Sequence, residues 1–189
     1  GHFFCKAVET IISKKVERVS NHKSKWIKKY KNPNIQELIK LHQKTRNMYF
    51  TTMKDTEYFN WRYLESPFRN DYIFYTFEKS NKIHLTMIIR KTKILNRLVI
   101  RIVDLFGATW DKVSLYALLS QLVSDSIKMR ATQITIIDGD KKNQLFLFKI
   151  GFILFKKVRF CYLDESRKNN VIPTKMRWSI SDSDNDFLD

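Results

Sequence analysis

Between residues 71 and 104 the apolar side chains recur with a period of two, and this pattern constrains the fold more than any other feature. Residues 72–77, 83–90 and 97–104 are rich in β-branched and aromatic residues, and short polar connections at 79–82 and 91–96 separate them. Such segments are typical of strands joined as hairpins. Three of them in succession predict an antiparallel meander at the centre of the domain.

The residues that follow the meander change the predicted topology. Residues 111–130 carry apolar side chains at helical spacing, and residues 132–138 form a β-branched run typical of a buried strand. A strand, a helix and a strand in this order predict a parallel crossover. A helix from Lys141 to a C-terminal glycine at Gly151, then strands at 152–162 and 176–180, complete the pattern. The predicted fold is α/β (α+β), with a mixed central sheet of about six strands flanked by helices.

The front of the chain has a different character. Apolar residues from Phe4 to Val19 recur at spacings of three and four with lysines between them, which predicts an amphipathic basic helix. Residues 22–31 are interpreted as a polar linker. Asn34 and Glu37 have the spacing of a capping box, and a helix of about four turns is expected after them. We therefore expect a front segment at 1–33 and one domain at 34–189.

A second cap signal lies further along the chain. Asp55 can cap a short helix that contains several aromatic residues, and Pro67 prevents this helix from extending further.

The charge of the chain is +16, and residues 1–54 hold +10 of it, with thirteen Lys/Arg against three Asp/Glu. Such an excess favours anionic partners, such as tRNA, an anionic membrane surface or the phosphates of a small-molecule substrate or cofactor, although a generally lysine-rich composition explains part of it. Because no apolar run is long enough for an integral membrane segment and no signal peptide is evident, we expect a cytoplasmic protein, free or peripheral at the inner membrane surface. The chain starts at Gly1 without a Met, so we expect the natural protein to extend upstream. The cysteines and histidines have no metal-ligand spacing, and no metal site is predicted.

Three local motifs add to the element order. They are Lys149-Ile150-Gly151-Phe152, the aromatic segment 58–63 with Pro67 and Tyr72 after it, and the segment 177–184. Together they resemble the GNAT acyl-CoA-dependent N-acyltransferases over residues 34–186, and in particular the acetyltransferase-like proteins of bacterial surface-polysaccharide synthesis. Because such modules can occur in tandem, the resemblance implies a second GNAT-like domain or a homodimer as a partner.

The resemblance implies acetyl-CoA or another acyl-CoA as the cofactor. It would be held by the central strand and by a helix N-terminus whose unpaired N–H groups favour a pyrophosphate. The corresponding cofactor-binding residues here are Val103, Gly107, Ala108, Thr109, Trp110 and Lys112. The family pattern Arg/Gln-x-x-Gly-x-Gly/Ala is matched only at Gly107, and the sequence departs from it further with the acidic residue Asp111. Two alternatives stay open: Trp110 closes the core, and Lys112 is solvated.

Two residues are candidates for the catalytic proton transfers. Asp104, at the end of the third predicted strand, is the candidate base, and the alternative is an Asp that caps the turn before Gly107. The family's acid, a tyrosine, is replaced here by Leu147, and its customary asparagine by Asp140. Tyr162 is the candidate acid in its place, with Cys161 beside it as the other option.

The acceptor side of the site is implied by two segments. Tyr58, Trp61 and Arg62 would border the acceptor, with Arg62 binding an anion such as a nucleotide-sugar phosphate. The alternative is that Trp61 is core and Arg62 a surface or ion-pair residue. Asp182 and Asp184 belong to an acidic substrate-side turn or to a solvated tail, and Phe187 at the required glycine position excludes a calcium loop.

Three functions follow from these observations. The first is an acyl-CoA-dependent N-acyltransferase, or a degenerate descendant, that acts on an amino sugar or another surface-glycan precursor. The second is a Fem-like aminoacyl-tRNA-dependent transferase, in which the basic front segment engages tRNA. The third is a non-catalytic GNAT-like scaffold module.

Overall fold

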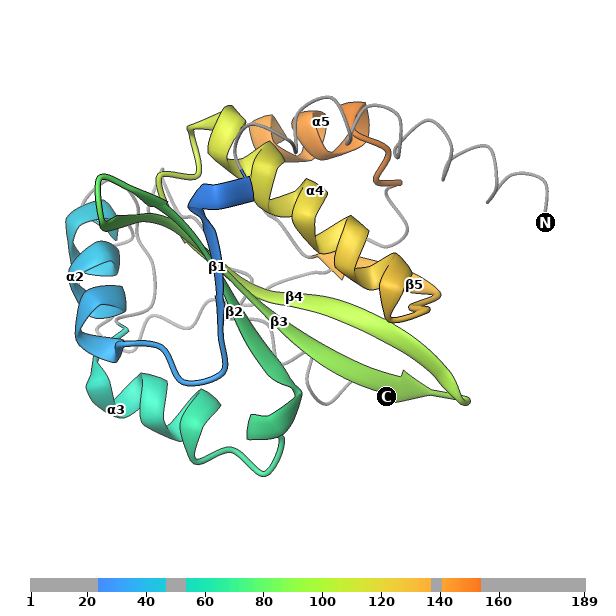
Figure 1. Cartoon of the computed structure of the whole chain (residues 1–189), viewed down its shortest axis with the longest axis horizontal. Helices are drawn as coiled ribbons and strands as arrows, with labels where there is room; N and C mark the ends of the chain where they lie inside the picture. The colour runs from blue at the N-terminus through green and yellow to red at the C-terminus, as the bar shows by residue number, and fades with distance from the viewer. Residues whose placement is uncertain (1–23, 47–53, 137–140, 154–189) are drawn as a thin grey trace, which may run out of the picture.

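A five-stranded sheet in the order β1-β2-β3-β4-β5 runs through the residues that the computed structural model describes, 24–46, 54–136 and 141–153 (Figure 1). Strands β1 to β4 are antiparallel neighbours, and β5 lies parallel to β4. The predicted meander and the predicted parallel crossover are both confirmed. The strands are β1 Ile27–Tyr30, β2 Tyr72–Lys79, β3 Lys82–Ile94, β4 Arg97–Gly107 and β5 Gln133–Ile136.

Both hairpins of the meander close through two residues with positive φ, Ser80–Asn81 at 51° and 59° and Leu95–Asn96 at 47° and 62°. These angles match the type I′ turn, whose twist suits antiparallel strands. The polar connection expected at 91–96 was therefore wrong over most of its length, because β3 continues to Ile94. The lysines in this segment suggested a loop, but they are compatible with a strand because a hairpin that projects from a sheet leaves polar side chains in solvent.

The linker expected at 22–31 was wrong at Ile27–Tyr30, which forms strand β1 and pairs with β2 from Ile27↔Phe77 to Tyr30↔Phe74. The ends of β1 are half-buried, while Lys28 and Lys29 between them are exposed. Among the described strands β1 lies at the edge of the sheet, and edge strands tolerate lysines, whose charges discourage further pairing. Four residues with two central lysines carry no strand signal of their own, so this segment becomes a strand because it pairs with β2. The division of the chain at residue 33 otherwise stays a prediction.

The other predicted strands, at 152–162 and 176–180, lie outside the described residues except for Phe152 and Ile153, and so does the helix predicted over Phe4–Val19. Among the described residues no helix is long and apolar enough to cross a membrane.

The other predicted helices, which fall on the described residues, are found, and their predicted caps with them. Asn34 accepts a hydrogen bond from the backbone N–H of Gln36 (3.1 Å), and Asp55 from that of Tyr58 (2.8 Å). At Gly151, with φ of 104°, the bonds Gly151 N–H to Phe148 O and Phe152 N–H to Leu147 O form a Schellman motif. The helical elements are η1 Ser24–Trp26, α2 Ile35–Arg46, α3 Thr56–Phe59, the π-helix η2 Asn60–Leu64, η3 Arg69–Asp71, α4 Lys112–Lys128 and α5 Lys141–Lys149.

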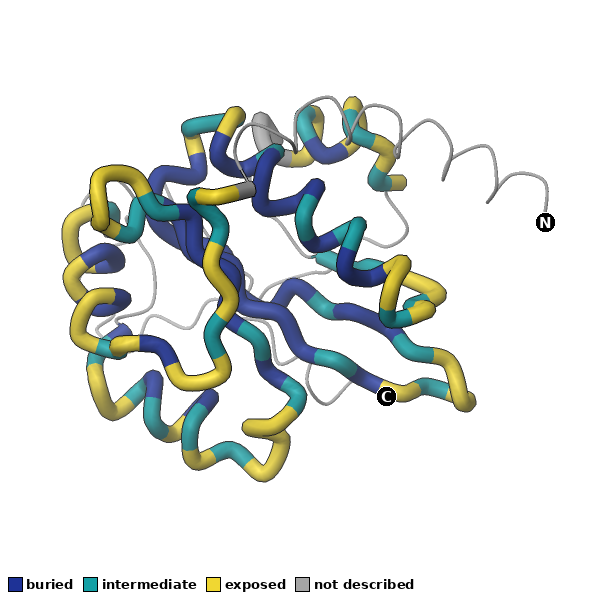
Figure 2. Tube along the Cα trace, viewed as in Figure 1, coloured by how far each residue is buried: buried dark blue, intermediate teal, exposed yellow. Residues whose placement is uncertain are grey.

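Helices cover both faces of the sheet, α2 with α3–η2 on one side and α4 with α5 on the other (Figure 1). The α2 face packs Leu38 and Phe59 against Ile88. The α4 face packs Leu118 and Leu122 against neighbouring sheet positions. The central strands are consequently buried on both sides, as Figure 2 shows.

Candidate functional site

Strand β4 contains a β-bulge at Val103. The register of β3 with β4 passes from Ile89↔Ile102 to Ile88↔Asp104, so Val103 is an extra residue. In a regular strand Asp104 would share the face of Ile102, which packs under α4. The bulge places Val103 and Asp104 on the same side instead, toward α2 and η2.

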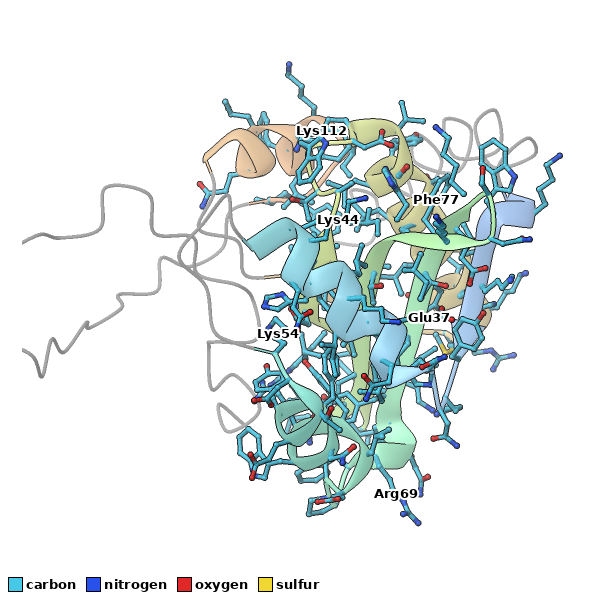
Figure 3. The ribbon with its side chains drawn as sticks, turned by 90° about the vertical axis from the view of Figure 1, so that its left-hand side faces the viewer. Glu37, Lys44, Lys54, Arg69, Phe77 and Lys112 are labelled. Atoms are coloured by element: carbon cyan, nitrogen blue, oxygen red, sulfur yellow. The ribbon has the colours of Figure 1, made fainter. Side chains whose placement is uncertain are left out.

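The carboxylate of Asp104 lies in a fully buried cluster with Lys54 and Tyr63, called the buried cluster below. Lys54 Nζ lies 3.0 Å from Asp104 Oδ2, and both side chains are 0% exposed. The Tyr63 hydroxyl donates to the same oxygen (3.1 Å), and the backbone N–H of Leu105 donates to the other (2.9 Å). In Figure 3 Lys54 lies between helix α2 and the α3–η2 segment.

Aromatic rings surround the ammonium group of the buried cluster. Lys54 Nζ lies 4.8 Å from the ring centroid of Tyr58 and 6.0 Å from that of Phe106. Burial raises the pKa of Tyr63 well above its usual value, and the charge of Asp104 raises it further, so the Tyr63 hydroxyl is a neutral donor. The buried charges are therefore compensated by each other, by hydrogen bonds and by ring faces.

The position of Asp104 excludes one of its two sequence interpretations. Strand β4 continues to Gly107, so Asp104 lies within the strand and the turn-capping alternative was wrong. As a candidate base it lies on the expected strand but is already paired with Lys54. Sequence reasoning missed Lys54, for which no local signal exists. It included Tyr63 only within the aromatic segment 58–63, although Phe59, Arg62 and Tyr63 have the i, i+3, i+4 spacing of one helix face.

In the aromatic segment 58–63, the structure differs from the expected alternative in the side chains that are buried. Trp61 is 65% exposed, whereas Arg62 is 9% exposed and Tyr63 is buried. Trp61 as a core residue and Arg62 as a surface residue were therefore wrong, because the helix face that holds the buried Phe59 also holds Arg62 and Tyr63. An ion-pair role for Arg62 stays a prediction. The exposed Trp61 lies beside Tyr58, with ring centroids 6.4 Å apart. The structure thus brings the exposed Trp61 next to the half-buried Tyr58, while Arg62 of the same segment is buried.

The turn from β4 to α4 is held tightly against β3. Gly107 has a φ of 104°, and a Cβ at this position would lie 2.7 Å from the carbonyl oxygen of His84. The N–H of Ala108 donates to the same oxygen (2.9 Å). Ala108 and Thr109 are buried, while Trp110 is 50% exposed, so the alternative that Trp110 closes the core was wrong.

The N-terminus of α4 carries its own carboxylate. Asp111 Oδ1 accepts from the backbone N–H groups of Val113 (3.1 Å) and Ser114 (3.3 Å), and Oδ2 accepts from the Ser114 hydroxyl (2.6 Å). His84 Nε2 lies 3.2 Å from Oδ2. Burial alone would raise the pKa of Asp111. The hydrogen bonds from Ser114, Val113 and His84 together lower this pKa by more, so the net shift is downward. A carboxylate therefore takes up donors that a pyrophosphate would use.

Other predicted site residues have structural partners or lie elsewhere. Lys112 is half-buried, donates to the carbonyl oxygen of Thr109 (3.3 Å) and lies 5.2 Å from the ring of Phe146 in α5, so it is not simply solvated (Figure 3). Leu147, at the position where the resemblance implies a tyrosine, packs in the core. The remaining candidates lie outside the described residues: Asp140, Cys161, Tyr162, Asp182 and Asp184.

Replacing Asp111 with Ala is expected to lower the free energy of unfolding by about 1 kcal/mol at neutral pH, because the α4 cap is lost. The folded-state pKa of Asp111 is lowered, so its contribution is full above about pH 4 and is lost as the pH falls through the folded value. Urea unfolding at pH 7 and at pH 3 measures this. Asp111→Ser, which keeps a cap, is the control, and a pH-independent difference would contradict the prediction.

The chain has structural relatives but no match in sequence: no protein-family model matches it, and no curated protein is similar to it. Among solved structures it is similar to a probable acetyltransferase, with TM-score 0.58 and 16% identity over 73% of this chain and 99% of that one. It is similar to the glucosamine-6-phosphate N-acetyltransferase of Arabidopsis thaliana, with TM-score 0.53 and 19% identity over 73% and 99%. A GNAT family acetyltransferase of Staphylococcus aureus gives TM-score 0.51 and 18% identity over 72% and 97%. At such identities the likeness concerns the fold.

Proposed function

Because this chain has the α+β GNAT fold, a mixed five-stranded sheet flanked by helices, we propose that it is an acyl-CoA-dependent N-acyltransferase. Its acceptor in this proposal is an amino sugar or another surface-glycan precursor. A glucosamine-6-phosphate N-acetyltransferase shares the fold, so the fold accommodates an amino-sugar acceptor.

The observation that carries the proposal is the bulge of β4. A bulge leaves the backbone of its extra residue outside the regular ladder, where a ligand can use it. Among the described residues, β4 pairs with β5 from Val99↔Gln133 to Ile102↔Ile136, and Ile136 is the last residue of β5 that the structure describes. The backbone of Val103 is thus our candidate for holding the acyl-pantetheine arm of acyl-CoA, which would supply the activated acyl group.

The pyrophosphate end of acyl-CoA fits this chain less well. The turn Gly107–Lys112 would hold it, but Asp111 already places a negative charge on the first N–H groups of α4. Lys112 is the nearest compensating cation of the turn. A bound pyrophosphate would have to share the α4 N-terminus with the Asp111 carboxylate.

In the proposed reaction the acceptor amine forms a new N–C bond, the C–S bond breaks, and the amine loses a proton. Asp104 Oδ2 is the proposed proton acceptor, and because its carboxylate is fully buried, the proton would be relayed to it through the Tyr63 hydroxyl that donates to it. Lys54 stabilises the carboxylate and orients it at the bulge. Tyr162 is the proposed proton donor to the leaving thiolate.

The acceptor is proposed to lie on the α3–η2 side. The exposed Trp61 offers a ring at the surface beside the half-buried Tyr58, and Arg62 is the proposed partner of an anionic group. Asp182 and Asp184 stay candidates for the amine side of the acceptor. The net charge of +16 favours an acceptor that carries phosphate.

A second function, a non-catalytic GNAT-like module, is favoured by two observations. The Asp111 carboxylate occupies donors at the α4 N-terminus, and Leu147 replaces the family's proton donor. Such a module would keep the fold and bind another protein of a glycan assembly complex without turnover.

Acetyl-CoA at about a hundred times its Kd is expected to stabilise the protein by about 2.7 kcal/mol, which raises Tm by about 5–10 °C. Calorimetric titration with acetyl-CoA and longer acyl-CoAs measures the affinity. Trp110, half-exposed on the phosphate-side turn, should be quenched by the ligand, and Trp110→Phe should remove that signal.

Asp111→Ser separates the two functions. In the transferase it should tighten acetyl-CoA binding by about fivefold, because one negative charge leaves the α4 N-terminus while a cap remains. If neither the natural protein nor Asp111→Ser binds any acyl-CoA, the transferase proposal fails and the non-catalytic module stands.

A further inference from the structure

The β3–β4 hairpin projects beyond the rest of the sheet. Strand β2 begins at Tyr72, opposite Arg90, whereas β3 continues to Ile94 and pairs with β4 over these last residues. In Figure 1 the hairpin extends past the body of the molecule, and Figure 2 shows that its tip is exposed.

The tip of this hairpin carries an apolar residue that the fold does not use. Leu95 is 92% exposed and has a φ of 47°, a left-handed backbone conformation that Gly, Asn and Asp adopt more readily than Leu. The other hairpin has the same turn geometry with Ser80 at the equivalent position. Neither burial in the core nor the preference of this turn therefore explains a leucine at position 95, and its side chain is exposed to solvent.

Basic residues surround Leu95. Lys93 pairs with Leu98 and Arg97 pairs with Ile94, so Lys93 and Arg97 lie on opposite faces of the hairpin. Residues 91–101 contain four basic residues and no acidic one. The exposed Lys128 and Arg130 follow from α4 into a loop that is tied to the hairpin, because Thr132 N–H donates to Leu98 O (2.8 Å).

A groove lies at the base of the same hairpin. Its lining combines basic, apolar and hydroxyl side chains with one carboxylate, that of Asp71. Lys91 and Lys93 contribute charge, while Phe68 and Met129 contribute apolar surface. Basic and apolar side chains are thus found together both at the tip of the hairpin and in the groove at its base.

We propose that the β3–β4 tip is a docking surface for an anionic lipid bilayer. Leu95 enters between the headgroups, and Lys93 and Arg97, supported by Lys128 and Arg130, contact lipid phosphates. A nucleic acid would also attract the basic side chains, but it has no use for an exposed Leu95. Stacking on bases needs aromatic rings, and residues 91–101 contain none.

The test places an environment-sensitive dye next to Leu95 in the full chain. Asn96→Cys is labelled in a Cys5→Ser/Cys161→Ser background, and Asn81→Cys, in the equivalent turn of the other hairpin, is the matched control. With vesicles of equal parts phosphatidylcholine and phosphatidylglycerol, the dye at 96 should shift to the blue and resist an aqueous quencher. Neither change is expected at 81, with pure phosphatidylcholine, or with tRNA.

Two substitutions then separate the apolar and the basic contributions. Leu95→Asn should abolish the shift at 96 and weaken vesicle binding by about tenfold, without lowering Tm, because Asn is favoured in this turn. Lys93→Gln/Arg97→Gln should weaken binding by about tenfold or more. Lys79→Gln/Lys82→Gln at the other hairpin removes the same charge and should change binding little.

Three results would overturn the proposal. An equal shift at 81 and 96 would mean that the tip is not inserted. Equal losses of binding for Lys93→Gln/Arg97→Gln and for Lys79→Gln/Lys82→Gln would assign binding to overall charge, including that of the front segment. A change at 96 with tRNA but not with vesicles would assign the surface to nucleic acid.

Discussion

Lys54→Met is expected to lower the free energy of unfolding by about 3–5 kcal/mol, because it leaves the buried carboxylate of Asp104 without its cation. The two charged atoms lie 3.0 Å apart and both side chains are 0% exposed, so solvent cannot replace the lost partner. Urea denaturation followed by circular dichroism measures the loss.

A double-mutant cycle supplies the control for this prediction. Lys54→Met/Asp104→Asn removes both charges and should recover much of the loss, so the two single effects should be far from additive. Lys29→Met is the matched comparison, because Lys29 Nζ also lies 3.0 Å from a carboxylate, that of Asp125, but its side chain is 47% exposed. It should cost at most about 1 kcal/mol. Comparable losses for Lys54→Met and Lys29→Met would contradict the role of burial.

Gly107→Ala is expected to cost about 2–4 kcal/mol, through strain at a positive φ and through overlap with β3. The new Cβ would lie 2.7 Å from His84 O and 3.0 Å from Leu85 Cα. Both atoms are backbone, and the Ala108 N–H bond to His84 O (2.9 Å) holds the turn in place, so neither side can withdraw cheaply. Thermal or urea unfolding gives the value.

Gly151→Ala separates the two causes of this loss. Gly151 has the same φ of 104° as Gly107 but lies exposed at the C-terminus of α5. Its replacement should cost only about 1 kcal/mol, from the backbone conformation alone. If both substitutions lower the free energy of unfolding equally, the close approach of Gly107 to β3 does not contribute to the loss.

Much of the fold could be predicted because its signals are local. The alternation in β2 to β4, the helical spacing in α4 and the caps at Asn34, Asp55 and Gly151 each depend on a few neighbouring residues. Strand β1 could not be predicted, because four residues with two lysines become a strand only when β2 offers its edge.

The candidate site was less predictable, because it depends on register. Asp104 and the turn at Gly107 could be named from the sequence, and an Asp before a helix is a local cap signal that suits Asp111. The partnership of Asp104 with Lys54 and Tyr63 could not, because the bulge at Val103 decides which face of β4 the carboxylate takes.

By itself, then, the sequence determined where strands, helices, caps and tight turns form, since backbone preferences and side-chain periodicity act over a few residues. Only the tertiary structure decided that a lysine just before a helix cap becomes a buried cation, that Trp61 faces outward, and that Leu95 stands at the end of a projecting hairpin. These outcomes depend on which distant segments pair and in which register, and a shift of one residue in a strand turns every side chain to the other face.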